Sequence, residues 1–444
     1  MFEVSGSLDT TLAGWVAELA RAEVPEDDAA KIDQLRQLEQ LKCVAEARQA
    51  RLAAALDRSQ RARAAECGEP AARQGRGIAE QVALARRESP HRGRQHLALA
   101  TVLERELPHT WAAFEQGRIT EWRATVIARE TACLSLEDRR AADRAIAGDP
   151  EALEGYSDRV VIAELRKLAC RLDPASVAER RRRAEAERCV TLRPAPDTMA
   201  YLTVLLPVAP AVAVYAALKA AADSGAATGD GRSRGQIMAD TLVSRVTRSS
   251  DESGRPVVPV SIGVVMTDRA LLAGAHDTAH LDGHGPVPAS LARDLLLAAG
   301  DAGTRIWLRR LFTSPTTGQL VAMDSRQRLF TGNLARFVRH RDQFCRTPWC
   351  NASIRHGDHA VDHADGGTTD ADDAQGLCEG CNHGKQGIGW RARPGPGPAH
   401  PDRGHTIETT TPTGHAYSST APPVLGLRRG AYVQVAEGRW NLIA

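Results

Sequence analysis

The sequence predicts an α+β protein that is mainly helical, in which a large helical N-terminal domain carries a small sheet and precedes a short zinc-clipped segment. Three observations predict this class. Apolar residues recur at three- and four-residue steps from Leu8 to about Leu172, and apolar and polar residues alternate after Cys189. Four cysteines in two close pairs, the mark of a small metal-stabilised fold, stand between Cys345 and Cys381.

Composition excludes several classes of protein. A chain of 444 residues has room for two or three domains, and contents of 43% apolar and 25% charged residues are those of a folded protein. A net charge of +2 is lower than a dedicated coat for DNA would usually carry, so any nucleic-acid contact must come from a local patch. The apolar run from Met199 to Ala222 is interrupted by Pro207 and Pro210, which argues against a membrane span.

Five further cysteines are scattered singly, which indicates reduced thiols in a cytoplasmic protein rather than a disulfide framework. The first residues have neither a basic nor an apolar signal region, so we expect no secretory signal. Cytoplasmic location follows from both points.

Residues 1–188 are predicted to form a helical bundle. A long Arg- and Glu-rich helix is expected to bury one apolar stripe, and it can pair with another helix in the chain or across a homodimer. The predicted stripe consists of Ile32, Leu35, Leu38, Leu41, Ala45, Leu52 and Leu56. The basic run 179–183 has two interpretations, a phosphate-binding face or a solvated helix partly neutralised by nearby glutamates, and base rates favour the second.

Residues 189–325 are predicted to be the α+β part of this domain. The expected elements are a hairpin from Cys189 to Leu206, helices at Ala211–Ala222 and Ile237–Thr247, a strand at Val257–Met266 and a second hairpin-like unit from Arg305 to Met323. We expect a small sheet laid against helices.

Residues 326–393 are predicted to form the metal-binding segment, followed by a Pro/Gly linker and tail at 394–444 with a strand near Tyr432–Val435. A helix at Leu334–Arg341 carries Arg336, Arg339 and Arg341. These cations either grip a phosphate backbone or form a solvated linker helix.

The two cysteine pairs predict one structural Zn²⁺. Cys345 and Cys350 enclose four residues, Cys378 and Cys381 enclose two, and each short turn can offer two thiolates to a tetrahedral ion. Disulfides or idle thiols are the alternative, but a cytoplasmic setting disfavours them.

Between and after these pairs lie Asp358-His359, Gly366-Gly367, and Leu377-Cys378-x2-Cys381-Asn382-x2-Lys385. In this order and spacing, the segment resembles the HNH endonuclease family, also called ββα-metal nucleases. Residues before it also look like the large N-terminal domain known as domain of unknown function family 222, on looser phrases such as Val190–Pro196 and Leu205-Leu206-Pro207.

The resemblance implies roles for particular residues. His359 would be the general base, Asp358 and Asn382 would hold a catalytic divalent ion such as Mg²⁺ or Mn²⁺, and Lys385 would contact phosphate. His383 competes with Asn382 for the last metal position, and His356 and His363 are further candidates beside the motif. Phosphodiester cleavage requires such a base and a cation where negative charge accumulates.

Two positions depart from the family pattern. Asp373 stands where the family has a middle Asn that helps orient the base, and Asp362 replaces a usual Pro. The leading hypothesis is therefore a metal-dependent HNH endonuclease acting on DNA, with Asp373 in the catalytic set. The alternatives are a catalytically decayed nucleic-acid-binding zinc module, or an interaction protein in which zinc is only a structural clip.

Overall fold

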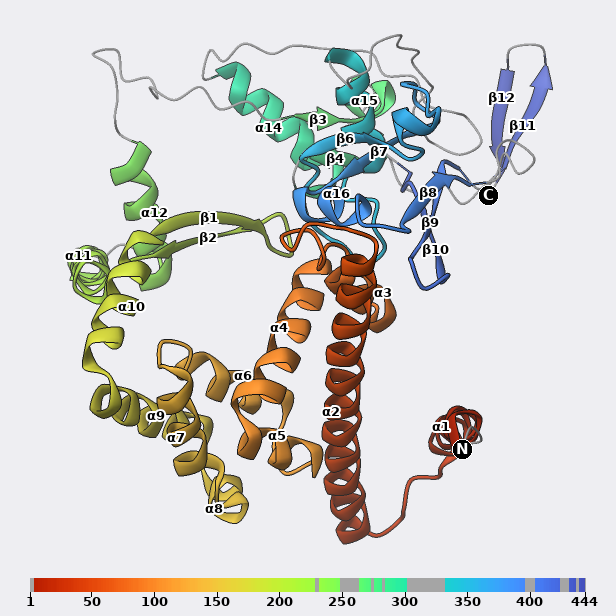
Figure 1. Ribbon diagram of the computed structural model, residues 1–444. Coiled ribbons are helices and arrows are strands. Elements are labelled where there is room, and N and C mark those ends of the chain that lie inside the picture. The colour runs from red at the N-terminus through yellow and green to blue at the C-terminus, as the bar shows by residue number, and fades with distance from the viewer. Residues whose placement is uncertain are drawn as a thin grey trace. The chain divides into compact units, whose positions relative to one another are not determined.

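The protein is described by a computed structural model, which covers residues 4–227, 231–247, 263–272, 275–281, 284–301, 332–395, 404–423, 431–436 and 439–443 (Figure 1). Helices dominate, and the strands form small two- and three-stranded sheets, which confirms the predicted mainly helical α+β class. Two compact units share the chain. One comprises Met1–Arg58 with His96–Val177, and the other comprises Ser59–Gln95 with Ala178–Ala444.

The first unit is entirely helical in its described residues, as the periodicity between Leu8 and Leu172 predicts. Its helices are α1 (Val4–Arg21), most of α2 (Asp28–Glu66), the second part of α4 (Pro90–Glu106), α5 (Pro108–Glu115), α6 (Glu121–Glu130), α7 (Leu136–Ala147), α8 (Pro150–Gly155) and α9 (Asp158–Leu172). The core includes the fully buried side chains of Leu103, Phe114, Ile127 and Leu165.

The buried stripe of α2 differs from the predicted one. Small residues, Ala47, Ala50 and Ala54, pack into the core, whereas Leu35 and Leu52 are 62% and 55% exposed. Short side chains let neighbouring helices approach α2 closely, so packing selects the alanine face rather than the leucine face. Hydrophobic periodicity detected the helix but chose the wrong side of it.

The second unit contains the remaining elements. Its helices are α3 (Ile78–Arg86), α10 (Pro174–Ala186), which begins in the first unit, α11 (Val208–Ala227), α12 (Arg234–Thr247), α13 (Asp268–Leu272), α14 (Ala289–Asp301), α15 (Gly332–Asp342) and α16 (Glu379–Lys385). Its strands are β1 (Cys189–Pro194), β2 (Ala200–Leu205), β3 (Val264–Val265), β4 (Ala279–Leu281), β5 (Gly285–Val287), β6 (His356–His359), β7 (Ala374–Leu377), β8 (Arg391–Pro394), β9 (Thr406–Thr410), β10 (Ala416–Thr420), β11 (Ala431–Ala436) and β12 (Arg439–Ile443).

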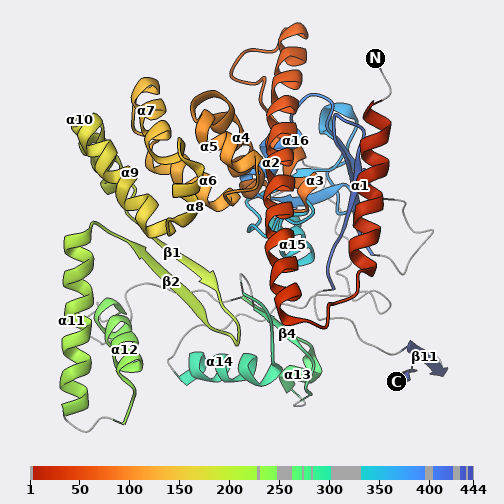
Figure 2. The same cartoon turned by 90° about the horizontal axis from the view of Figure 1, so that it is seen from below.

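Several predicted elements are confirmed. Strands β1 and β2 form the antiparallel hairpin expected after Cys189, which Figure 2 shows as a twisted ribbon leading into α11 and α12. Strand β11 contains the predicted terminal strand. The expected unit Arg305–Met323 and the first part of the strand Val257–Met266 lie outside the described residues. The predicted domain boundaries at 188/189, 325/326 and 393/394 stay predictions.

The segment that carries the site runs from α15 through β6 and β7 to α16, and it is followed by the three-stranded sheet β10-β9-β8 (Figure 1). Helix α15 packs on β7 through Leu334, Phe337 and Val338, which meet Ala371 and Ala374. Among the described helices, none combines the length and apolar character that a membrane crossing requires.

Candidate functional site

Strands β6 and β7 form an antiparallel hairpin, and α16 follows β7 directly. His359 pairs with Ala374 and His356 pairs with Leu377, so the hairpin is in register over all four residues of β6. Between the strands, Gly367 cannot carry a side chain, because a Cβ there would lie 1.9 Å from the Val361 carbonyl oxygen. The order strand, strand, helix brings the Asp358-His359 pair next to the helix that begins at the second cysteine pair.

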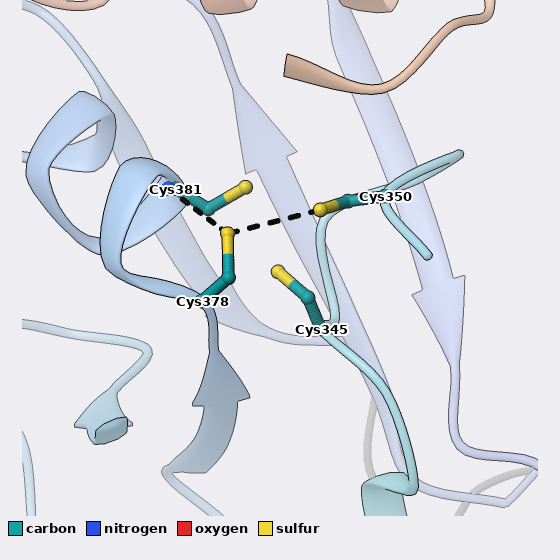
Figure 3. Close-up of side chains that lie close together, drawn as sticks. All are labelled: Cys345, Cys350, Cys378 and Cys381. Atoms are coloured by element: carbon teal, nitrogen blue, oxygen red, sulfur yellow. Dashed lines mark hydrogen bonds between the residues drawn. The ribbon is translucent and has the colours of Figure 1, made fainter. Parts of the chain in front are cut away.

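The four predicted cysteines come together. Figure 3 shows Cys345 and Cys350 on the loop after α15, Cys378 just before α16 and Cys381 within it, with all four sulfurs facing one another. Their sulfur atoms lie within 4.8 Å of one another, and Cys350 Sγ is 3.8 Å from Cys378 Sγ. Four ligands about 2.3 Å from a tetrahedral zinc ion are about 3.8 Å apart, so the cluster fits a metal ion such as zinc.

Local geometry prepares the thiols for metal. The Cys350 N–H donates to the Thr347 carbonyl at 3.0 Å, which closes the first turn, and the Cys381 N–H donates to Cys378 Sγ at 3.4 Å, which closes the second. Hydrogen bonds from the Cys345, Cys350 and Cys381 thiols lower the pKa of Cys378, which favours its thiolate form. Metal binds thiolates, so such a group is a ready initial ligand.

A buried ion network ties the first cysteine pair to α15 and β7. Asp342 accepts from Arg341 Nε at 2.7 Å, from Arg346 Nη1 at 3.0 Å and from the Gly376 N–H at 2.7 Å. Burial opposes ionisation of Asp342, but the Arg341 and Arg346 guanidinium groups together outweigh it and lower the pKa of that carboxyl. Sequence reasoning missed Asp342 and Arg346, because α15 ends at Asp342 and a four-residue spacing signals a pair only within a helix.

The C-terminal sheet completes this network. Arg346 donates to Ser419 Oγ at 3.1 Å and to the His405 carbonyl at 3.1 Å, and the Trp349 ring meets the Tyr417 ring edge-on with centroids 6.0 Å apart. Burial lowers the pKa of His405 to about 4, so its ring is neutral at pH 7 and adds no third charge. Residues 405–419 belong to the segment predicted as linker and tail, and they support the first cysteine pair.

Helix α3, from the N-terminal half of the chain, packs on α16. Glu80 is 7% exposed, pairs with Arg94 at 2.9 Å, and fills the space beside Gly384 and close to Cys378. Burial raises the pKa of Glu80, and the Arg94 guanidinium opposes that rise. A Cβ on Gly384 would lie 2.7 Å from Glu80 Cγ, so the two helices touch because this residue has no side chain.

His359 is buried at the end of β6, with 9% of its surface exposed. Its Nε2 lies 2.8 Å from Thr369 Oγ1, and its ring meets that of His363 edge-on at 5.5 Å. Burial lowers the pKa of His359 below the ordinary histidine value, so the imidazole is neutral at pH 7. Thr369 was not anticipated, because a threonine ten residues away carries no motif signal.

Lys385 links α16 to the neighbouring carboxylates. Its Nζ is 2.7 Å from Asp358 Oδ2 and 2.9 Å from Asp362 Oδ1, and it also donates to the His359 carbonyl oxygen. The side chain of Lys385 is only 10% exposed. This ion pair joins Asp358 to α16, the helix that also carries Asn382, and it leaves Lys385 engaged with carboxylates.

Two buried oxygens near the site accept no hydrogen bond, Asn382 Oδ1 and Asp373 Oδ2. Asp373 Oδ1 accepts from the Val361 N–H at 2.9 Å, so this carboxylate ties the loop after β6. Burial raises the pKa of Asp373 to about 6. A buried amide oxygen without a donor is an acceptor in need of a cation or a hydrogen bond.

The three arginines predicted to contact nucleic acid differ in how deeply they are buried. Arg341 is 2% exposed and donates to the carbonyl oxygens of Ala371 and Ala374. It therefore belongs to the core, and the expectation that it contacts nucleic acid does not hold, because its donors are already used inside the protein. Arg336 and Arg339, in contrast, are exposed on α15.

The histidines that compete for the metal position, and the basic run 179–183, can both be judged from their exposure and contacts. His383, His356 and His363 are exposed, whereas the Asn382 side-chain oxygen is buried. In α10, Arg182 and Arg183 pair with Glu179, and Arg181 pairs with Glu185 at 3.1 Å. These contacts favour the solvated interpretation of the run 179–183.

Comparison with known proteins identifies the larger part of the chain. The model of the family described as domain of unknown function, DUF222, matches residues 38–342, more than half of the 444 residues, so the chain belongs to this family. No curated protein and no solved structure matches the chain. The match ends at the last residue of α15, before the four cysteines.

The sulfur cluster predicts one tightly bound zinc ion per chain. In Cys381→Ser, one of four ligands loses its thiolate, so we expect the zinc content measured by elemental analysis to fall from one per chain to well below one. Cys67→Ser, which changes an exposed cysteine, is the matched control and should keep the metal. Equal zinc in all three proteins would exclude the cluster as the binding site.

The α3–α16 contact predicts a specific effect of Gly384→Ala. The new Cβ must push Glu80 aside, which should lower the local opening free energy of residues 78–86 and 379–385 by about 1–2 kcal/mol in amide hydrogen exchange. The control Gly235→Ala lies in α12 with nothing within 4 Å, and it should be neutral or stabilising by about 0.5–1 kcal/mol. A neutral Gly384→Ala would argue against this contact.

The raised pKa of Asp373 predicts a pH-dependent stability change in Asp373→Asn. The folded protein holds this proton up to about pH 6, while the unfolded chain releases it near 3.8, so the destabilisation of the fold grows above about pH 3.8 and is complete above about pH 6. We expect Asp373→Asn to raise the free energy of unfolding by about 2–3 kcal/mol at pH 7.5, and by about half of that at pH 5. Denaturant titrations of the zinc-loaded proteins measure this. A gain independent of pH would contradict the assignment.

Proposed function

We propose that the chain is a metal-dependent HNH-type endonuclease that hydrolyses phosphodiester bonds in DNA, with His359 as general base. One observation carries the proposal, the 2.7 Å contact between Lys385 on α16 and Asp358 on β6. It joins the Asp358-His359 pair to the helix face that carries Asn382 one turn earlier, since residues three apart lie on the same side of a helix. The strand, strand, helix order of β6, β7 and α16 supports the same assignment.

The surroundings of His359 suit a base. The lowered pKa keeps the imidazole neutral at pH 7, which is the form that can accept a proton from an attacking water molecule. The contact between Nε2 and Thr369 Oγ1 fixes the orientation of the ring. Thr369 thereby supplies the positioning that the family resemblance attributes to a middle Asn. Asp373, in that place, holds the Val361 N–H of the adjoining loop and positions the base through the backbone.

Asp358 and Asn382 fit a hard divalent ion such as Mg²⁺ or Mn²⁺. Carboxylate and amide oxygens are the ligands these ions prefer, and the buried Asn382 Oδ1 accepts no hydrogen bond from the protein. When bound, such an ion supplies positive charge at the scissile phosphate. Asp358 and Asn382 would orient it from β6 and α16, while His359 handles the proton.

The four cysteines would hold a structural Zn²⁺ that clips the segment together. Thiolates prefer zinc to magnesium, so zinc would bind the four cysteines and the other divalent ion would bind the oxygen ligands. Reduced thiols of this kind are kept in the cytoplasm, where we place the protein.

Contact with DNA would come from exposed cations next to the site. Arg336 and Arg339 are exposed on α15, which precedes the first cysteine pair, and guanidinium groups bind phosphate well. The helical domain would position the substrate or mediate assembly. Exposed apolar residues of α1, such as Trp15 at 49% and Leu19 at 48%, support a homodimer formed through N-terminal helices.

Plasmid nicking tests the proposal. Purified zinc-loaded protein should nick supercoiled DNA with Mg²⁺ or Mn²⁺, and His359→Ala should reduce the rate by at least about 100-fold, because the general base is lost. Zinc content should stay at one per chain. His383→Ala, which changes an exposed histidine on α16, is the matched control and should retain activity. Undiminished nicking by His359→Ala would exclude His359 as the base.

A second candidate function is a nucleic-acid-binding module that no longer cleaves. The buried charge of Asp373 and the extra carboxylate of Asp362 near Asp358 favour it, because both add negative charge where a phosphate must approach. This alternative predicts salt-sensitive DNA binding without turnover. If the double change Asp373→Asn and Asp362→Pro creates metal-dependent nicking in an inactive wild type, the site is a decayed nuclease. A double variant that still fails to nick would argue that the site was never a nuclease.

A further inference from the structure

Three oxygen atoms converge on the ammonium group of Lys385. They are Asp358 Oδ2 at 2.7 Å, Asp362 Oδ1 at 2.9 Å and the His359 carbonyl oxygen. The lysine side chain is 10% exposed and the Asp358 side chain 23% exposed, so the pair between them is partly shielded from solvent. A carboxylate that the proposed function assigns to a divalent ion is thus already neutralised by a cation of the chain itself.

We propose that Lys385 competes with the divalent ion for Asp358, so that metal and phosphodiester bind cooperatively; this inference rests on the proposed function of the same site. A divalent ion and an ammonium on the same carboxylate repel each other, so each weakens the hold of the other on Asp358. Metal binding to Asp358 is therefore strongest when Lys385 leaves.

The displaced ammonium then lacks an anion. Its four-carbon stem is flexible, and the closest anion in a substrate complex is the phosphodiester that the metal also contacts. A phosphate that draws Lys385 away frees Asp358 for the metal, and a metal that displaces Lys385 frees the ammonium for phosphate. By thermodynamic reciprocity, each ligand raises the affinity of the other by the same factor.

Asp362 is the second carboxylate that binds the ammonium group of Lys385. It stands where the resemblance leads one to expect Pro, and its carboxylate gives the ammonium a second partner. The extra charge strengthens the hold on Lys385 in the absence of substrate. A site so built carries its metal only when nucleic acid is present, which restrains cleavage by the free protein.

Mn²⁺ binding to the zinc-loaded full-length protein tests the competition without any need for activity. Free Mn²⁺ is counted by electron paramagnetic resonance in wild type, Lys385→Met and Lys385→Gln, and zinc content confirms the fold of each. We expect both variants to bind Mn²⁺ about tenfold more tightly than wild type. Lys167→Met, which breaks a lysine–glutamate pair in α9, is the matched control and should not change the affinity.

The cooperative part is tested with a short DNA duplex in a His359→Ala background, in which the DNA is not cut. The duplex should tighten Mn²⁺ binding several-fold more when Lys385 is present than in Lys385→Met, where only the direct contact between metal and phosphate couples the two ligands. Unchanged or weaker Mn²⁺ binding in both lysine variants would overturn the proposal, because Lys385 would then support the metal site or ignore it.

These outcomes separate the inference from the proposed function. Nicking by wild type, together with unchanged Mn²⁺ affinity in the lysine variants, would leave the nuclease standing and remove the competition. Tighter Mn²⁺ binding in both variants, together with no nicking and no DNA binding, would keep the competition and remove the nuclease.

Discussion

The convergence of four sulfur atoms is the constraint on which the rest of the site depends. Cys345 and Cys350 come from a loop after α15, and Cys378 and Cys381 come from the start of α16, so a single ion bound there would join two parts of the chain that share few other apolar contacts. The hairpin β6–β7 lies between the two cysteine pairs in the sequence, and its strands are only four residues long. Its position relative to α16 determines whether Asp358 and Asn382 can face the same ion.

Buried ion pairs, rather than apolar side chains, connect the segments around this cluster. Asp342 is fully buried and holds two arginines and a backbone N–H, and each of the two arginines also satisfies carbonyl oxygens of other segments. Paired, hydrogen-bonded charges of this kind fix one geometry, because removal of any one member leaves another buried and unpaired. Beside α16, the buried Glu80 pairs with the half-exposed Arg94.

The sequence allowed the sulfur cluster and the main elements to be predicted, since ligand spacing and hydrophobic period are properties of neighbouring residues. It did not allow the surroundings to be predicted. Arg341 looked like a surface cation of a basic helix, but its burial depends on carbonyl oxygens of the Ala371–Ala374 turn, some thirty residues away. Thr369 and Glu80 were missed because their partners lie outside any local motif, and Arg346 was missed because most of its acceptors lie in the C-terminal sheet. For α2, the period fixed the helix but not its buried face, which depends on the size of the side chains opposite.

The docking of β9 and β10 on the first cysteine pair changes what counts as the site-bearing piece of this protein. Arg346 is 3% exposed, and much of its hydrogen bonding comes from His405 and Ser419, which stand beyond the Pro/Gly stretch. A fragment that stopped near residue 393 would remove the acceptors at His405 and Ser419 and leave that guanidinium with Asp342, and one that began at α15 would lack Glu80 and Arg94. The residues that support the site therefore come from three separate parts of the chain: an early helix pair, the cysteine-bearing segment and a late sheet. A chimaera that transfers this site to a related protein would have to include all three parts of the chain.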